Sequence, residues 1–136
     1  VLNAVAAGTT DQNGTVIDMQ GFEGVLFLAT FGALTATQVT QIKAQQGLLA
    51  DGSDMADLAG TQTGPLADAD GNKVLGVDVY RPRERYVRVV VDRGTANAVI
   101  DGAVAIQYGA HKAPTTHDAT TVKSIETHAG PAEGTA

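Results

Sequence analysis

The stretch that decides the fold runs from Val74 to Tyr108. It reads Val-Leu-Gly-Val-Asp-Val-Tyr at 74–80, Arg-Pro-Arg-Glu-Arg at 81–85 and Tyr-Val-Arg-Val-Val-Val-Asp at 86–92, before a third apolar run over 97–108. Apolar residues alternate along these runs, which is the period of a β-strand with one buried face. Short turns rich in Arg, Pro and Gly separate the runs, so the three strands are predicted to be antiparallel neighbours.

The alternation assigns each strand a set of residues on one face. The sets are Leu75, Val77 and Val79; Val87, Val89 and Val91; and Ile100, Val104, Ile106 and Tyr108. Gly102 interrupts the last strand and is predicted to be a bulge.

Upstream of this stretch, Asn13-Gly14 is a strong signal for a hairpin turn, because both residues tolerate a positive φ. A strand is predicted to follow at 15–19. The uninterrupted apolar run 25–31 is rich in β-branched and aromatic residues and is flanked by glycine, which favours a buried strand over a buried helix.

Segment 37–46 fits both a helical stripe and one face of a strand, and its Thr and Val residues favour the strand. The Asp- and Gly-rich segment 48–72 is predicted to be long connections around one short strand or helical turn near 55–58.

Seven or eight strands without a strong helix indicate an all-β protein, an antiparallel β-sandwich or jelly roll with extended terminal arms. Residues 1–12 are expected to be an N-terminal arm or edge strand, and residues 13–109 the sandwich domain. Residues 110–136 hold six Thr, all three His and no aromatic residue, so they are expected to be a C-terminal tail that is flexible or ordered by a partner.

Composition excludes several classes of function. The 136 residues carry a formal net charge of −6, which argues against nucleic acid and anionic membranes as partners. No run of eighteen apolar residues predicts a transmembrane helix. The chain has no Cys, so neither a disulfide nor a thiolate metal site is possible.

No motif predicts catalysis, a metal or a cofactor. His111, His117 and His128 lack the spacing of metal ligands. Residues 68–72 resemble the opening of a calcium loop, but the sixth position is not glycine and the twelfth, Val79, is not Glu, so a hairpin turn into the strand 74–80 is predicted instead. The sequence therefore predicts a protein that is not an enzyme.

All five arginines fall between Arg81 and Arg93, on an otherwise acidic chain. In one interpretation this is a solvated hairpin whose arginines pair with Glu84, Asp78 or Asp92. In the other it is an interface patch, because Tyr and Arg are enriched where proteins bind each other. The candidate interface residues are Tyr80, Arg81, Arg83, Glu84, Arg85, Tyr86, Arg88 and Arg93.

Three motifs occur in order along the chain: Gly-Phe-Glu-Gly-Val-Leu-Phe at 21–27, Ile-Lys-Ala-Gln-Gln at 42–46 leading to Asp-Gly-Ser-Asp-Met-Ala-Asp-Leu-Ala-Gly at 51–60, and the segment 78–94. Together they resemble the capsid cement, or decoration, proteins of tailed bacteriophages. The resemblance covers about residues 15–108 and implies a jelly-roll fold, homodimers, and clamping of neighbouring major capsid protein subunits on the outer surface of the virion.

The leading functional hypothesis is therefore a structural virion protein that stabilises the shell. Two alternatives stay open at this point. One is a soluble carbohydrate- or receptor-recognition sandwich of a phage appendage, although sugar-binding platforms commonly expose Trp and this chain has none. The other is a component of a head-tail connector.

Overall fold

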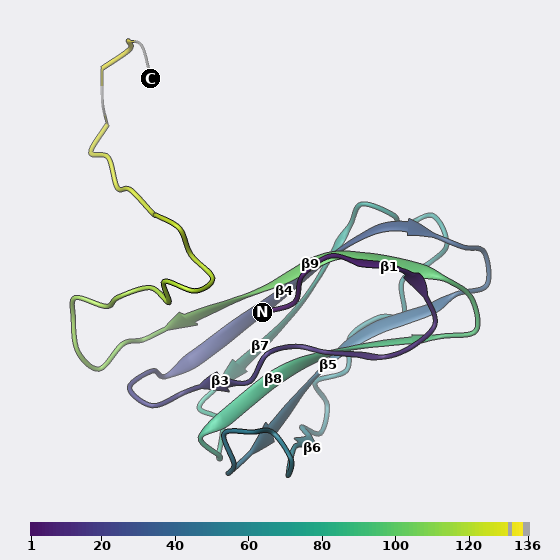
Figure 1. The fold of residues 1–136 in the computed structure, drawn as a ribbon, viewed down its shortest axis with the longest axis horizontal. Helices are drawn as coiled ribbons and strands as arrows, with labels where there is room; N and C mark the ends of the chain where they lie inside the picture. The colour runs from purple at the N-terminus through teal and green to yellow at the C-terminus, as the bar shows by residue number, and fades with distance from the viewer. Residues whose placement is uncertain (131, 135–136) are drawn as a thin grey trace.

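The protein is a sandwich of two antiparallel β-sheets, with the C-terminal segment leading away from them (Figure 1). The computed structural model describes residues 1–130 and 132–134, and its regular elements there are all strands. In chain order they are β1 (Val5–Gly8), β2 (Gln12–Asn13), β3 (Ile17–Asp18), β4 (Gly24–Leu34), β5 (Val39–Gly47), β6 (Ala56–Asp57), β7 (Val74–Tyr80), β8 (Tyr86–Gly94) and β9 (Ala98–Tyr108).

The strands divide between two sheets. One sheet has the order β1-β9-β4-β7, and the other has the order β2-β8-β5-β6, with β3 also paired to β8. The long strands β4, β5, β7 and β8 alternate between the two sheets along the chain, so most connections cross from one layer to the other. The all-β antiparallel sandwich predicted from the sequence is confirmed.

The core between the sheets contains few aromatic residues. Its largest fully buried side chains include Phe27 and Phe31 of β4, Ile42 of β5 and Ile100 of β9. The predicted core set of β8 also points inward, and all three of its valines are fully buried. Alternate apolar residues from both sheets therefore form one continuous hydrophobic core.

Most predicted strands are present. The segments 25–31, 37–46, 74–80, 85–92 and 97–108 correspond to β4, β5, β7, β8 and β9, and the short strand expected near 55–58 is β6. Segment 37–46 is a strand and not a helix, because its residues pair along nearly the whole length of β8.

The hairpin predicted at Asn13-Gly14 is wrong. β2 and β3 both pair antiparallel with β8, so the chain passes through Gly14 without reversing direction. Neither Asn13 nor Gly14 has the positive φ of a tight hairpin turn. Gly14 instead lies against the backbone of β8, donating its N–H to the Val89 carbonyl at 2.8 Å, and a Cβ there would lie 2.9 Å from the Val89 side chain. Close packing is the reason for glycine at this position.

The bulge predicted at Gly102 is present, but its consequence for the strand's faces differs from the prediction. Gly102, at φ 153°, pairs with Thr30, whereas Ile100 pairs with the next residue, Phe31. This extra residue in β9 moves all later side chains to the opposite face. Ile100 is therefore buried, while Val104 and Ile106 are exposed on the outside of the sheet.

Within residues 1–12, Val5–Gly8 form the edge strand β1, whereas Gln12 already belongs to β2 of the other sheet. β1 pairs with β9, and the N-terminal amine of Val1 donates a hydrogen bond to the Ala103 carbonyl at 2.9 Å. Residues 110–130 contain no strand and are almost entirely exposed. No helix long and apolar enough to cross a membrane occurs in the part of the chain that the structure describes.

Candidate interaction site at one end of the sandwich

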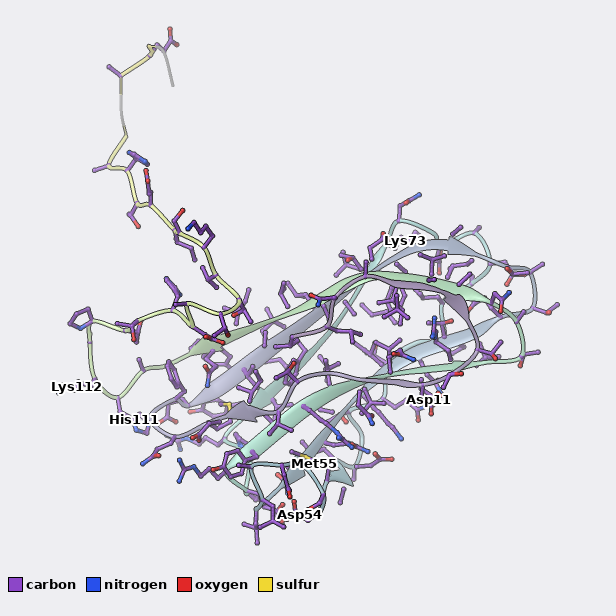
Figure 2. The ribbon with its side chains drawn as sticks, in the orientation of Figure 1. Asp11, Asp54, Met55, Lys73, His111 and Lys112 are labelled. Carbon is purple, nitrogen blue, oxygen red and sulfur yellow. The ribbon has the colours of Figure 1, made fainter. Side chains whose placement is uncertain are left out.

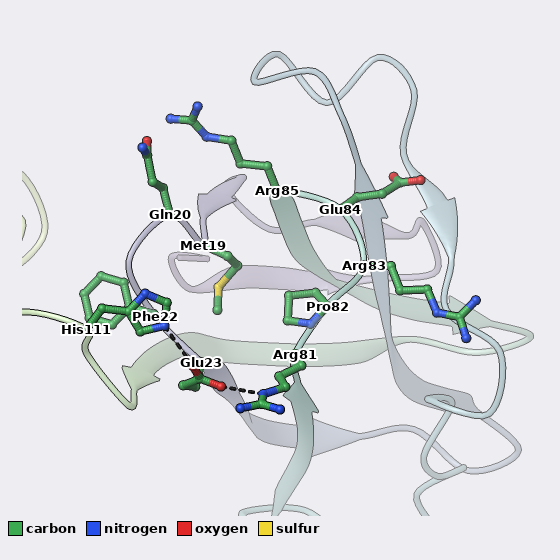
Figure 3. Close-up of a pocket in the computed structure, with 10 residues that line it drawn as sticks. All are labelled: Met19, Gln20, Phe22, Glu23, Arg81, Pro82, Arg83, Glu84, Arg85 and His111. Carbon is green, nitrogen blue, oxygen red and sulfur yellow. Dashed lines mark hydrogen bonds and ion pairs between the residues drawn. The ribbon is translucent and has the colours of Figure 1, made fainter.

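The arginine-rich loop 81–85 joins β7 to β8 at one end of the sandwich. The turn from β3 into β4 and the start of the C-terminal segment lie at the same end, and together they border an open hollow of about 530 Å³ (Figure 3). The hollow is lined by Met19, Gln20, Phe22, Glu23, Arg81, Pro82, Arg83, Glu84, Arg85 and His111. His111 and Lys112 lie at this end, far from Lys73 (Figure 2).

Glu23 joins three segments at the edge of the hollow. Its Oε2 accepts a hydrogen bond from Nε of Arg81 at 2.6 Å, and its Oε1 lies 2.8 Å from Nε2 of His111. The backbone N–H of Arg81, a residue with φ 50°, also donates to the Glu23 carbonyl at 2.7 Å. The Arg81 guanidinium, and after it His111, holds the pKa of Glu23 below its ordinary value.

Arg85 makes a forked ion pair with Asp18 of β3. Its Nε and Nη2 donate to the two carboxylate oxygens at 2.9 and 2.7 Å, which lowers the pKa of Asp18. The guanidinium groups of Arg81 and Arg85 also lie over the rings of Tyr80 and Tyr86, at 5.1 and 5.2 Å from the ring centroids. These contacts fix both arginines at the rim.

The Arg83 side chain makes no hydrogen bond or ion pair with any residue that the structure describes, although its backbone N–H donates to Gln46. Figure 3 shows Arg81, Arg83 and Arg85 pointing in different directions rather than toward one centre. Such an arrangement suits several carboxylates spread over a protein surface better than one small anion.

The prediction that the arginines pair with Glu84, Asp78 or Asp92 is wrong. Glu84 has no ion pair among the described residues, Asp78 accepts from the Tyr108 hydroxyl, and Asp92 accepts from Gln41. The actual partners, Glu23 and Asp18, precede the loop by about sixty residues, so local sequence could not identify them.

Two of the eight candidate interface residues lie outside this end. Arg88 points to the outer face of the second sheet, where its Nε donates to Gln45 at 2.7 Å. Arg93 is only 5% exposed. The prediction that Arg93 belongs to an exposed interface patch is therefore wrong, because its side chain is buried within the fold. Tyr80, Arg81, Arg83, Glu84, Arg85 and Tyr86 remain together.

Sequence reasoning missed two exposed leucines beside the arginine loop. Leu48 and Leu49, 66% and 51% exposed, follow β5 directly, and β5 ends where Gly47 pairs with Tyr86. The signal that could have found them is the pair of consecutive leucines between Gly47 and Asp51, in a segment predicted to be a connection. This end therefore presents cations, tyrosine rings and exposed aliphatic side chains together.

The remaining motifs form no metal site in the described residues. No group of three potential ligands is present in residues 1–130 and 132–134. The segment 68–72 is a turn: Asp70 accepts from the backbone of Ala67 and pairs with Lys73, and Asn72 has φ 66°. It is not the hairpin turn that was predicted, because β7 pairs with β4 and not with a strand that directly precedes the turn.

Comparisons of the chain with protein-family models, with curated proteins and with solved structures gave no match.

The two ion pairs at this end predict a pH-dependent stability. Asp18 and Glu23 have pKa values below their ordinary 3.8 and 4.5, so their contribution is complete above those values and is lost as the pH falls through the lower, folded-state pKa values. The double variant Arg81→Gln/Arg85→Gln is expected to melt at a lower temperature than the unmodified protein at pH 7. The difference should shrink as the pH falls below 4.5, because both carboxylates become protonated as the pH passes through their lowered folded-state pKa values.

Circular dichroism melts at several pH values measure this difference. A variant at Arg83, whose side chain makes no ion pair with any described residue, is the control, and its effect on the melting temperature should not follow the same titration. If the difference in melting temperature between the double variant and the unmodified protein stays constant between pH 7 and about 2, the two ion pairs do not stabilise the fold.

Proposed function

We propose that the protein is a structural, non-enzymatic capsid cement protein, which binds the outer surface of a tailed-phage shell and clamps neighbouring major capsid protein subunits. The observation that carries this proposal is the end of the sandwich where three exposed arginines occur together with exposed Tyr80, Leu48 and Leu49 and half-buried Tyr86. These residue types are enriched at protein interfaces, and Arg and Tyr are enriched among the side chains that contribute most to binding.

The strand order supports the jelly-roll assignment within this proposal. Each sheet combines one or two short N-terminal strands with long strands from later in the chain, so that β9 lies between β1 and β4, and β8 lies between β2 and β5. Such interleaving of early and late strands is typical of two-sheet folds built from Greek keys. The sequence resemblance to cement proteins implies the same fold.

The mechanism would be mass action. A protein that binds the assembled lattice, and not the separated subunits, stabilises the lattice by the free energy of its binding. Arginines that point in different directions can contact carboxylates on more than one capsid subunit, and repetition over the shell makes many modest contacts sufficient. The C-terminal segment 110–130 begins beside the arginine loop and could extend this contact area.

Co-sedimentation with empty, expanded shells of the matching phage tests the proposal. We expect saturable binding at a fixed ratio to capsid subunits, and a higher rupture temperature for decorated shells than for bare ones. A chain ending at Gly109 keeps all nine strands and shows whether the tail contributes to binding. A folded protein that does not bind the shells would contradict the proposal and favour a sugar-binding or connector role, which a glycan panel and native mass measurements would separate.

A further inference from the structure

Three of the four edges of the two sheets are blunted. The edge strand β1 has four residues, and its register with β9 shifts between Val5 and Gly8. On the other sheet β2 and β3, with two residues each, form one edge, and the two-residue β6 forms the other. Short strands and register breaks are devices that protect the edges of native sheets from pairing with another chain.

β7 forms the fourth edge and lacks these devices. Its seven residues pair with β4 in unbroken register, from Val74 opposite Thr30 to Tyr80 opposite Gly24. No other strand of the described chain pairs with β7, and the strand contains neither proline nor lysine. β7 therefore presents a long, regular edge, which is the kind that accepts an additional strand.

The hydrogen bonds to β4 determine which backbone groups of β7 face this edge. In an antiparallel pair, every second residue exchanges hydrogen bonds with the partner strand, and the residues between them point their N–H and C=O groups to the other side. The N–H of Arg81 donates to the Glu23 carbonyl at 2.7 Å, so residues 75, 77 and 79 bond to β4 in the same way. The residues whose backbone faces the open edge are Val74, Gly76, Asp78 and Tyr80.

These four residues are exposed, and no backbone group of another described segment bonds to their open side. Thr120 and Thr121 of the C-terminal segment border a hollow that also includes Val74. The N–H groups of Thr121 and Val122, however, donate to the Asp118 carbonyl and not to β7. The described part of the tail therefore leaves this row of donors and acceptors uncovered.

Two cations flank the open edge. Lys73 precedes β7 and Arg81 follows it, and their side chains are 64% and 69% exposed. Each has a carboxylate partner in its own chain, Asp70 for the lysine and Glu23 for the arginine. An ammonium group has three donors and a guanidinium group has five, so each can also bind a second carboxylate. A segment that lies along β7 is therefore stabilised by a carboxylate at each of its ends.

The same charges disfavour a second copy of the protein at this edge. An antiparallel pair of β7 strands that uses all four open residues is centred on Val77, with Val74 opposite Tyr80. This pair sets Lys73 of each copy opposite Arg81 of the other, and like charges directly opposite each other are destabilising. The charges favour a segment of a different polypeptide.

The side chains of β7 indicate what the centre of that segment contains. Gly76 has no side chain and lies beside Leu28, whose Cδ2 is 3.1 Å from the position of a Cβ on Gly76. A β-branched side chain opposite Gly76 can pack into this space against Leu28. Asp78 is the one charged residue of β7, and its two oxygens already accept from the Tyr108 hydroxyl at 2.9 and 3.0 Å. The centre of the edge therefore suits uncharged, β-branched residues.

We propose that the open edge of β7 binds an extended segment of a different protein, which adds a fifth strand to the four-stranded sheet. The segment has about seven β-branched, uncharged residues with a carboxylate at each end. Its backbone pairs with the four open residues of β7, and its carboxylates pair with Lys73 and Arg81. This surface does not depend on the proposed capsid role.

The synthetic peptide acetyl-Glu-Thr-Val-Thr-Val-Thr-Val-Thr-Glu-amide is the probe, and nuclear magnetic resonance of the labelled full chain measures hydrogen exchange in β7. Without peptide, the amides of Gly76 and Asp78 should exchange at least about tenfold faster than those of Val77 and Val79. The peptide should bind saturably below about 1 mM and slow exchange at Gly76 and Asp78 about tenfold. Slow exchange at these two amides without peptide, or no binding at about 1 mM, would overturn the inference. Slow exchange that appears only as the protein concentration rises would assign the edge to a second copy and would also overturn it.

Gly76→Pro tests the backbone pairing directly, because it removes an N–H that faces the edge and leaves the bonds to β4 intact. Its affinity for the peptide should be at least about tenfold weaker than that of the matched control Gly76→Ala, which keeps the N–H. Circular dichroism shows whether each variant is folded. Val74→Pro and Val74→Ala repeat the comparison at the first residue of the strand, where proline is tolerated best. Equal affinities within a folded pair would show that the peptide does not bind by strand addition.

A peptide with Lys in place of both Glu residues tests the charges and should bind at least about tenfold more weakly. Equal binding of the two peptides would refute the acidic ends of the proposed segment. Shell binding by a protein whose edge rejects the peptide would leave the proposed function standing. Peptide binding by a protein that ignores shells would refute only the function.

Discussion

Replacing Arg93 with Met is expected to lower the free energy of unfolding by about 3 kcal/mol. Arg93 is buried and its guanidinium donates to three backbone carbonyls: from Nε to Thr10 at 2.8 Å, and from Nη1 to Ala6 and Ala98 at 3.1 and 2.8 Å. Methionine fills part of the space but donates nothing, so these carbonyls lose a charged donor. A hydrogen bond to a charged group contributes about 1.5–3 kcal/mol, and relaxation recovers part of the sum.

Arg83→Met is the matched control, because the Arg83 side chain is exposed and makes no hydrogen bond or ion pair with the described residues; it should change stability by less than about 0.5 kcal/mol. Arg93→Lys should have an intermediate effect, since one ammonium cannot replace a planar fork that reaches several carbonyls. Urea unfolding measures all three variants. Equal stability of Arg93→Met and Arg83→Met would show that the buried contacts are not stabilising.

Loss of these bonds should act first on the N-terminal edge. Thr10 and Ala6 belong to the segment that carries β1, and Asp11 accepts from the backbone N–H of Arg93 at 3.0 Å. Arg93 thus ties residues 6–11 to the end of β8. Hydrogen exchange of Arg93→Met should show lost protection in β1 beyond that in β4, and uniform loss over both strands would contradict this local role.

Local sequence was sufficient to predict the strands that form the core. In β8 the predicted core residues Val87, Val89 and Val91 are all fully buried, so the local pattern and the tertiary structure coincide there, although Val90 on the opposite face is also buried. The error in β9 has a specific cause. Gly102 was correctly predicted to be a bulge. The inserted residue, however, moves every later side chain of β9 to the opposite face of the sheet. Which face those apolar side chains occupy depends on the register of β9 with β4, which local sequence does not determine.

The candidate site was predicted only in part, again because local sequence does not show which distant segments meet in the fold. The loop 81–85 could be identified because its composition departs from that of the rest of the chain. Its partners could not, because Glu23 and Asp18 reach it through the folding of distant strands. Arg93 shows the same limit most clearly: its type and its neighbours suggest a surface residue, and only the return of residues 6–11 and the start of β9 bury it.

Neutralising the arginine loop is expected to weaken shell binding by roughly 100- to 1,000-fold at physiological salt, because each of the three lost contacts should cost about a factor of five to ten. The triple variant is Arg81→Gln/Arg83→Gln/Arg85→Gln. Arg83 should have the largest single effect, because its side chain makes no hydrogen bond or ion pair with any described residue and can give its donors to a partner without breaking such a bond. Arg81 and Arg85 already donate hydrogen bonds to Glu23 and Asp18, so fewer of their donors are free for a partner.

Arg88→Gln is the matched control for the single variant Arg83→Gln, since it removes the same charge from the outer face of the second sheet. Binding isotherms on expanded shells should show a tenfold loss for Arg83→Gln and little change for Arg88→Gln. Raising the salt concentration should weaken binding of the unmodified protein more than that of the triple variant, because screening acts on the charges the variant lacks. If the triple variant binds with unchanged affinity and the same salt dependence, the arginine loop does not contact the capsid, and the exposed Leu48 and Leu49 beside it become the residues to replace next.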